Sequence, residues 1–237
     1  MQIPVQAKPD CLLLDVESTA VIVVDMQNEF GSKGGLFDRI GIDISPIQAV
    51  IGPIARVLTS ARRVGFPIVY LKMGFHPDLS DAGPVDGPNR VKHRQHIGES
   101  MQAPNGEASR ILIRDTWNTD IVSALEPEAD DIVMYKHRFS GFYNTDLHAA
   151  LQRQKIKNLI FTGCTTSVCV ESTLRDAMFR DYTCLLLADC AAEPIGNQIP
   201  RSNHEATLLV IERLFGWVSD STNLLHALKQ LPTATTV

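Results

Sequence analysis

The chain has 237 residues, of which 44% are apolar and 21% are charged, enough core-forming material for one large or two small domains. Its 27 acidic and 22 basic side chains leave a net charge of −5, which argues against a nucleic-acid partner or an anionic membrane surface. The longest apolar runs are strand-sized, far short of the roughly 18 to 20 residues that span a bilayer. The first residues also lack the basic and apolar regions of a secretory signal, so we expect a cytoplasmic protein.

The strands and helices can be predicted from hydrophobic periodicity. In chain order, the sequence predicts strands at 20–24, 67–71, 131–135, 158–162 and 183–188, and helices at 47–64, 147–154, 168–181 and 201–214. Most strands are apolar on both faces and helices connect them. We therefore expect an α/β fold, with a three-layer αβα arrangement around a mainly parallel sheet of roughly six strands.

The region 73–109 interrupts this rhythm. Gly, Pro, Asp and Asn crowd together at 81–89, and a loop of this length inside a compact domain is usually functional or mobile. The chain shows no repeat, low-complexity tract or clean linker. We therefore predict a single domain over residues 1–237, with an irregular substrate loop at about 73–109.

The cysteines do not form a recognisable framework. Five of them occur, at Cys11, Cys164, Cys169, Cys184 and Cys190, and no two have the CxxC spacing of a zinc knuckle or a thioredoxin-type pair. An odd number in a chain of this size also argues against a disulfide scaffold. At least one thiol needs another explanation.

Three reactive side chains follow predicted strands, at the edge where parallel sheets bind ligands. Asp25 follows 20–24, Lys136 follows 131–135, and Cys169 lies shortly after 158–162, near the start of a helix. A helix N-terminus and a nearby ammonium group lower the pKa of a thiol, so we expect a Cys169 thiolate, with Asp25 moving a proton beside it. Singly, each residue has a plainer explanation: a small buried thiol, a helix cap and a solvated lysine.

Three separated motifs carry a resemblance to a known family. They are VVDMQN at 23–28, KHRFSGFYNTDL at 136–147 and TGCTTSVCV at 162–170. Together they resemble the isochorismatase-like cysteine hydrolases, and the similarity runs in order from about residue 19 to residue 228.

The resemblance implies roles for the residues in these motifs. Cys169 is then the nucleophile, Asp25 the general acid and base, and Lys136 the cation that supports developing charge. It also implies a cis peptide bond between Cys164 and Thr165, with the N–H groups of Thr165 and Cys169 as the oxyanion hole. Family members that act on isochorismate lack the cysteine nucleophile, so the intact triad implies amide hydrolysis.

Within the family, SGFYNT at 140–145, CVESTLRD at 169–176 and FGWVSD at 215–220 are most similar to the ureidoacrylate amidohydrolases of pyrimidine breakdown. The substrate loop departs from that group. Met73, Gly74 and Phe75 stand where an Asn and a Trp are expected, and HPDLSD at 76–81 is closer to the biuret and triuret hydrolases. The resemblance therefore implies hydrolysis of a ureido or carbamoyl carbon–nitrogen bond through a thioester, in nitrogen catabolism.

We expect no metal and no organic cofactor. Nicotinamidases of this fold bind a metal through an Asp-x-His triplet, and the corresponding triplet, Gly74-Phe75-His76, lacks the Asp. His93 and His96 have no evident third ligand in the sequence.

The candidates for substrate binding are Gln27, Asn28, Phe75, Arg90, Trp117, Phe142 and Tyr143. The two amides next to Asp25 suit the urea end of a substrate, or equally a turn and a helix start. The arginine, with Lys92 and Arg94, suits a substrate carboxylate, or a solvated loop. The aromatic residues suit a pocket wall, or the core.

Other readings stay open at this point. A related amidase would act on N-carbamoylsarcosine, nicotinamide or a simple acyl amide. A thiol redox or binding protein would use Cys164 and Cys169 as a pair, and would leave Asp25 and Lys136 without a role. The expected partner is a small ureido molecule, and the resemblance implies a homodimer or homotetramer.

Overall fold

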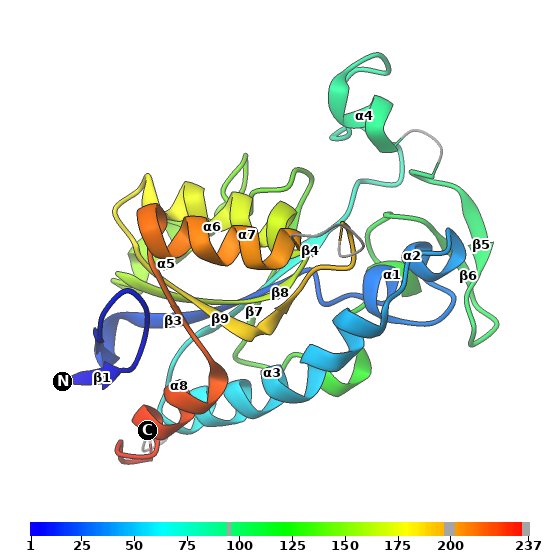
Figure 1. Ribbon diagram of the computed structural model, residues 1–237. Helices are drawn as coiled ribbons and strands as arrows, with labels where there is room; N and C mark the ends of the chain where they lie inside the picture. The colour runs from blue at the N-terminus through cyan, green and yellow to red at the C-terminus, as the bar shows by residue number, and fades with distance from the viewer. Residues whose placement is uncertain (94–95, 197–201, 234–237) are drawn as a thin grey trace.

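A computed structural model describes the chain except residues 94–95, 197–201 and 234–237 (Figure 1). Its centre is a six-stranded sheet in the order β10-β9-β8-β3-β4-β7, in which every neighbouring pair is parallel. The strands are β3 (Thr19–Val24), β4 (Ile68–Met73), β7 (Ile132–Lys136), β8 (Asn158–Cys164), β9 (Thr183–Ala192) and β10 (Trp217–Ser219). The predicted parallel sheet is confirmed.

Helices cover both faces of this sheet (Figure 1). On one face lie α3 (Ser45–Arg63) and α8 (Ser221–Leu228), and on the other lie α5 (Leu147–Arg153), α6 (Glu171–Met178) and α7 (Asn203–Val210). Along β3, Val21 and Val23 pack into the core cluster of the first face, and Ile22 and Val24 into that of the second. This alternation explains why every residue of β3 is buried, and it confirms the predicted three-layer αβα fold.

Several small elements were not predicted. Hairpins form between β1 (Gln2–Val5) and β2 (Leu12–Asp15), and between β5 (Ser100–Gln102) and β6 (Ala108–Arg110). The short helices are α1 (Asn28–Gly31), α2 (Leu36–Arg39) and α4 (Pro88–His93), with 3₁₀ turns at Val16–Ser18, Trp117–Thr119 and Ser123–Leu125. The loop expected at 73–109 therefore contains a helix and a hairpin, each too short to show a period in the sequence.

Two predicted helices are interrupted. The one expected at 168–181 is a π-helical turn, Thr166–Val170, followed by α6. The one expected at 201–214 begins at a residue outside the described part, and the rest is α7 followed by a second π-helical turn, Ile211–Phe215. None of the described helices combines the length and apolar character needed to cross a membrane.

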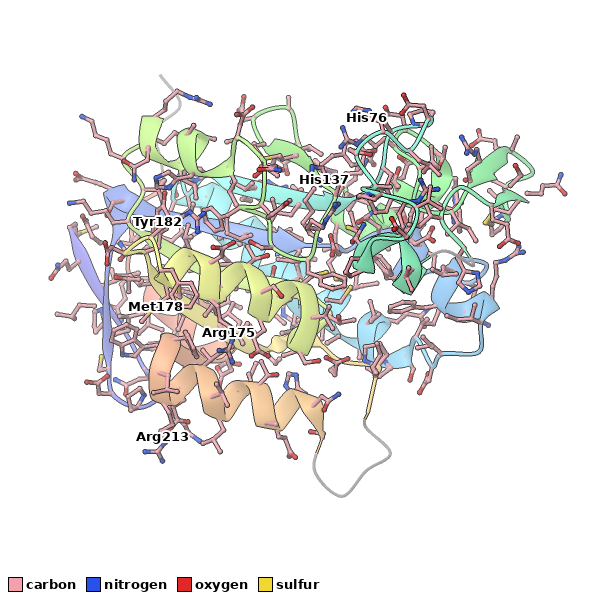
Figure 2. All side chains as sticks on the ribbon, turned by 90° about the horizontal axis from the view of Figure 1, so that it is seen from above. His76, His137, Arg175, Met178, Tyr182 and Arg213 are labelled. Carbon is pink, nitrogen blue, oxygen red and sulfur yellow. The ribbon has the colours of Figure 1, made fainter. Side chains whose placement is uncertain are left out.

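The strand order brings the carboxyl ends of β8, β3, β4 and β7 side by side. Asp25, Lys136 and the turn that carries Cys169 follow or end three of these neighbouring strands. Seen from above, His137 and His76 lie together at this end of the molecule, whereas Met178 and Tyr182 lie at the opposite end (Figure 2). The topology thus assembles the loops of distant segments over one edge of the sheet.

Glu29 is a buried acid that connects α1 to the segment after β6. Its Oε2 accepts a hydrogen bond from Asn118 Nδ2 at 2.5 Å, and its Oε1 has no partner among the described residues. Burial raises the pKa of Glu29 to about 8, although hydrogen bonds from Asn118 and Leu112 oppose the shift. The side chain is therefore a neutral acid at pH 7.

Replacing Gly163 should test the close contact between β8 and β3. Gly163 has a φ of +113°, and a Cβ there would lie 2.0 Å from the Val24 carbonyl oxygen. We expect Gly163→Ala to lower the free energy of unfolding by more than about 3 kcal/mol, from backbone strain and the clash. Gly41→Ala is the matched control, because Gly41 has a φ of +80° but nothing within 4 Å of its Cβ position, and should cost about 1 to 2 kcal/mol. Equal losses in urea denaturation would contradict this account.

The pH dependence of stability should change in Glu29→Gln. The folded pKa of about 8 exceeds the value of 4.5 for an unperturbed Glu, so the folded protein keeps a proton that the unfolded chain releases. Wild-type stability therefore falls as the pH rises from about 4.5 to about 8, by at most about 5 kcal/mol, since each pKa unit is worth about 1.4 kcal/mol. Gln does not ionise, so we expect the free energy of unfolding of the variant, measured in urea, to rise relative to that of the wild type between about pH 5 and pH 8.5. A difference that stays constant with pH would refute this prediction.

Candidate active site

Asp25 and Lys136 form a buried ion pair at the carboxyl ends of β3 and β7. Lys136 Nζ donates to Asp25 Oδ2 at 2.8 Å, and the two residues are 0% and 1% exposed. Lys136 Nζ also donates to the Arg138 carbonyl at 3.3 Å. Burial alone favours the neutral amine, but the Asp25 carboxylate and the Cys169 sulfur raise the pKa of Lys136 above its usual value. The lysine is therefore a cation with its partner already in place.

Cys169 lies beside this pair, in the π-helical turn after β8. Burial and the negative charge of Asp25 raise the pKa of the Cys169 thiol, and Lys136 offsets them only in part. The raised pKa runs against the expected resting thiolate. Its physical reason is that Lys136 is already neutralised by Asp25, so the ammonium is not free to hold a second anion.

The turn that carries Cys169 is held from three directions. Glu193 Oε2, just after β9, accepts hydrogen bonds from the Ser167 N–H at 2.8 Å and the Ser167 hydroxyl at 2.5 Å. Thr166 Oγ1 and His204 Nδ1 of α7 are 3.0 Å apart, and Thr173 Oγ1 donates to the Cys169 carbonyl at 2.7 Å. These contacts fix the backbone around the sulfur.

The peptide bond between Cys164 and Thr165 is cis, as the family resemblance implies. Cys164 Sγ donates to the Asp25 carbonyl at 3.2 Å, which ties the end of β8 to the end of β3. Among the described residues, no carbonyl or side chain accepts a hydrogen bond from the Thr165 N–H. That N–H group is therefore available to a ligand.

A cavity of about 270 Å³ opens onto these groups, with Asp25, Cys164, Thr165 and Cys169 in its wall. The rest of the wall is apolar and includes Phe30, Leu36, Phe37, Leu112, Phe139 and Ile195. No Arg or Lys is among the described residues that line it. A small uncharged group suits this cavity better than a free carboxylate does.

The structure brings the triad together but places the predicted amides outside the cavity wall. Gln27 Oε1 accepts from the Met73 N–H at 2.7 Å and its Nε2 donates to the Met73 carbonyl at 2.9 Å, so this amide joins β3 to β4. Asn28 Nδ2 donates to the Trp117 carbonyl at 3.0 Å, and both residues line a different surface hollow. Their amide groups are engaged in hydrogen bonds within the fold.

The other candidates also lie away from the described wall. Phe75 is buried in a cluster with Leu112 and other apolar residues, and Phe142 is buried beneath the Arg180 guanidinium. Tyr143 is 48% exposed, and Arg90 lies on α4 without lining the cavity. The side chains of Lys92 and Arg94 lie outside the described part of the structure.

Sequence reasoning missed the apolar wall. Phe139 could have been predicted as a wall residue, because it lies three residues after Lys136 in the motif at 136–147. Phe30, Leu36 and Phe37 come from helices of four residues, where no periodicity marks an inward face. Leu112 has a φ of 56°, a conformation that could not be predicted from the sequence around it.

No group of three or more His, Cys, Asp or Glu side chains in the described residues is arranged to hold a metal ion. His76 instead contacts Arg114, with 3.2 Å between His76 Nε2 and Arg114 Nη1, and His96 lies against Glu99. The side chain of His93 lies outside the described part. All five cysteines are free thiols.

The chain is similar to known proteins of one family. A model of the isochorismatase domain matches residues 19–223. The ureidoacrylate amidohydrolase RutB of Methylobacterium radiotolerans is 42% identical over 214 residues, 90% of this chain and 81% of the relative. The RutB of Acinetobacter baylyi is 37% identical over 221 residues, 93% of this chain and 88% of the relative.

A solved cysteine hydrolase from Pseudomonas syringae pv. phaseolicola superposes with a TM-score of 0.76 at 27% identity, over 92% of this chain and 95% of that one. An N-carbamoylsarcosine amidase from Thermoplasma acidophilum shares the fold, with a TM-score of 0.62 at 24% identity, over 86% of this chain and 96% of that one. The resemblance carried by the three motifs is confirmed: the chain belongs to the isochorismatase family of hydrolases.

Proposed function

We propose that this amidohydrolase cleaves the ureido carbon–nitrogen bond of a small urea-type substrate, with Cys169 as the nucleophile. The observation that carries the proposal is the buried Asp25–Lys136 pair beside the Cys169 thiol, on the floor of a cavity. Relatives named ureidoacrylate amidohydrolase, 37% to 42% identical over most of the chain, support the ureido substrate.

The reaction begins with a proton transfer. Because Cys169 is a thiol at rest, it needs a base, and Asp25 Oδ1 has no hydrogen-bond partner among the described residues. Asp25 takes the thiol proton as the sulfur attacks the ureido carbonyl carbon, and Lys136 holds the other carboxylate oxygen in place.

The charge that develops on the carbonyl oxygen is stabilised by the backbone N–H groups of Thr165 and Cys169. A urea carbonyl is deactivated by resonance, so these donors carry much of the rate, about 3 to 4 kcal/mol for each donor. Asp25 then returns its proton to the departing nitrogen, which leaves a carbamoyl thioester on Cys169. A water molecule that Asp25 deprotonates hydrolyses the thioester, and the carbamate released breaks down to ammonia and carbon dioxide.

Ureidoacrylate is the first candidate substrate, and biuret and triuret are the second, because of the residues at 76–81. A homodimer or homotetramer, a cytoplasmic location and a single domain remain predictions. The rival redox reading requires Cys164 and Cys169 to act as a pair, but Cys164 Sγ is engaged with the Asp25 carbonyl. Full activity of Cys164→Ala would remove that rival.

The substrate is tested by measuring ammonia release from ureidoacrylate, biuret, triuret, N-carbamoylsarcosine and nicotinamide in parallel. We expect one ureido compound to exceed the others by more than about a hundredfold in kcat/KM, about 2.7 kcal/mol of transition-state discrimination. Carbon dioxide should accompany the ammonia, because the carbonyl leaves as carbamate.

Cys169→Ser is the blank in this assay, since it keeps the size of the side chain but lacks the thiol. Retention of a few per cent of the wild-type rate would contradict the thioester mechanism. Inertness of every ureido compound, with turnover of nicotinamide alone, would replace the proposed substrate class by a simple amide.

A further inference from the structure

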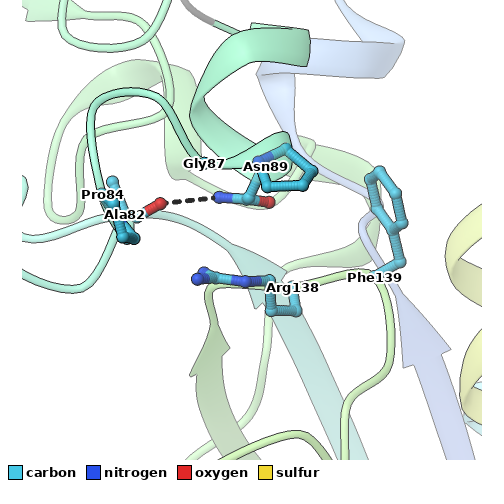
Figure 3. A pocket seen from close by; sticks show the side chains of 8 residues that line it. Ala82, Pro84, Gly87, Asn89, Arg138 and Phe139 are labelled. Atoms are coloured by element: carbon cyan, nitrogen blue, oxygen red, sulfur yellow. Dashed lines mark hydrogen bonds between the residues drawn. The ribbon is translucent and has the colours of Figure 1, made fainter.

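A second cavity, of about 400 Å³, is shown in Figure 3. The loop at 82–89 forms one side of it, and Arg138 and Phe139 form the other. Phe139 also lines the cavity around Cys169, so this one side chain belongs to both walls. The two cavities therefore meet at Phe139.

The two cavities differ in charge. The described wall around Cys169 contains no Arg or Lys, and the buried Lys136 behind it is already paired with Asp25. A carboxylate enclosed there would lack a counter-ion, which is unfavourable in an apolar environment. Arg138 supplies a cation in the adjacent cavity, in the same motif as Lys136.

The guanidinium group of Arg138 is held in place through one of its nitrogens. Nη1 donates to the Asp81 carbonyl at 3.1 Å and to the His137 carbonyl at 2.6 Å. Among the described residues, Nη2 and Nε have no hydrogen-bond acceptor. Two donors of a pre-positioned guanidinium are therefore left for a ligand, in the geometry that carboxylates prefer.

A glycine of the loop faces this edge of the guanidinium. A Cβ at Gly83 would lie 3.0 Å from Arg138 Nη2, and Gly83 has a φ of +87°, a conformation that disfavours larger residues. Asn89 Nδ2 donates to the Ala82 carbonyl at 3.0 Å, which closes the loop on the side facing Arg138 (Figure 3). The second cavity and the two donors left without an acceptor among the described residues, Nε and Nη2, thus occur together at Arg138.

We propose that Arg138 binds the carboxylate tail of the substrate, while the ureido end lies at Cys169 and the chain between them packs against Phe139. This inference rests on the proposed ureido hydrolysis and names the substrate class within it, a ureido acid. A planar unsaturated chain suits the face of the Phe139 ring. Neutral ureides such as biuret lack the group that Arg138 would recognise.

The kinetic test compares ureidoacrylate with its neutral carboxamide analogue, following carbon dioxide release, which reports ureido cleavage alone. In Arg138→Met, the ratio of kcat/KM for the acid to kcat/KM for the carboxamide should fall about 10- to 100-fold, mainly through KM of the acid, because a charge-assisted hydrogen bond is lost. Arg138→Lys keeps the charge but lacks the paired donors of a guanidinium. Its acid-to-carboxamide ratio should therefore lie between those of the wild type and Arg138→Met.

Arg114→Met is the matched control, because Arg114 also braces the same loop. Its Nη2 donates to Asp81 Oδ2 at 2.6 Å, yet it lines neither cavity. This variant should leave the acid-to-carboxamide ratio unchanged. If Arg138→Met lowers kcat/KM equally for the acid and the carboxamide, as Arg114→Met would through the loop, then Arg138 only supports the loop. That result would overturn the proposal.

A binding measurement separates this proposal from the proposed reaction. Calorimetry measures the affinity of 3-ureidopropionate for the Cys169→Ser protein with and without Arg138→Met, and needs no turnover. At least tenfold weaker binding without Arg138 supports the carboxylate site even if ureidoacrylate is not hydrolysed. Equal affinities, or no binding by either protein, overturn it even if the wild type hydrolyses neutral ureides.

Discussion

The active site depends on one buried ion pair, Asp25 with Lys136. Each charge alone would be strongly disfavoured inside the protein, and loss of one partner of such a pair typically costs about 3 to 5 kcal/mol. The two residues can pair because the β8-β3-β4-β7 order places the carboxyl ends of β3 and β7 at the same edge of the sheet. The Lys136 ammonium also bonds the Arg138 carbonyl, so the same contact positions the residue that follows β7.

In the proposed mechanism, this ion pair decides the protonation of Cys169. Lys136 is paired with Asp25, so burial prevails and raises the pKa of Cys169. The two oxygens of Asp25 differ: Oδ2 accepts from Lys136, and Oδ1 has no partner among the described residues, as the proposed proton transfer requires. A resting thiol is also less exposed to oxidation than a thiolate, which suits a hydrolase better than a redox protein.

Features that depend on neighbouring residues could be predicted from the sequence, whereas contacts between distant segments could not. The strand at 20–24 was evident because every residue is apolar, and Asp25, Lys136 and Cys169 follow strand ends inside distinctive motifs. β10 has three residues and offers no such signal. The contact of Gln27 with the Met73 backbone could not be predicted, because Met73 is 46 residues away and becomes a neighbour only when β3 pairs with β4. The apolar wall likewise arises from contacts between short segments without periodicity.

The most direct test of the central claim is the alkylation rate of Cys169 by iodoacetamide near pH 7, resolved by peptide mass spectrometry, in the wild type and in Asp25→Asn. The exposed Cys11 serves as the internal reference. Removing the Asp25 charge frees Lys136 to stabilise the thiolate, so Cys169 should be alkylated about tenfold faster in the variant, since that corresponds to one pKa unit, while hydrolysis is lost. Alkylation of Cys169 that is as fast or faster in the wild type would show that the thiolate already exists at rest, and would contradict the account.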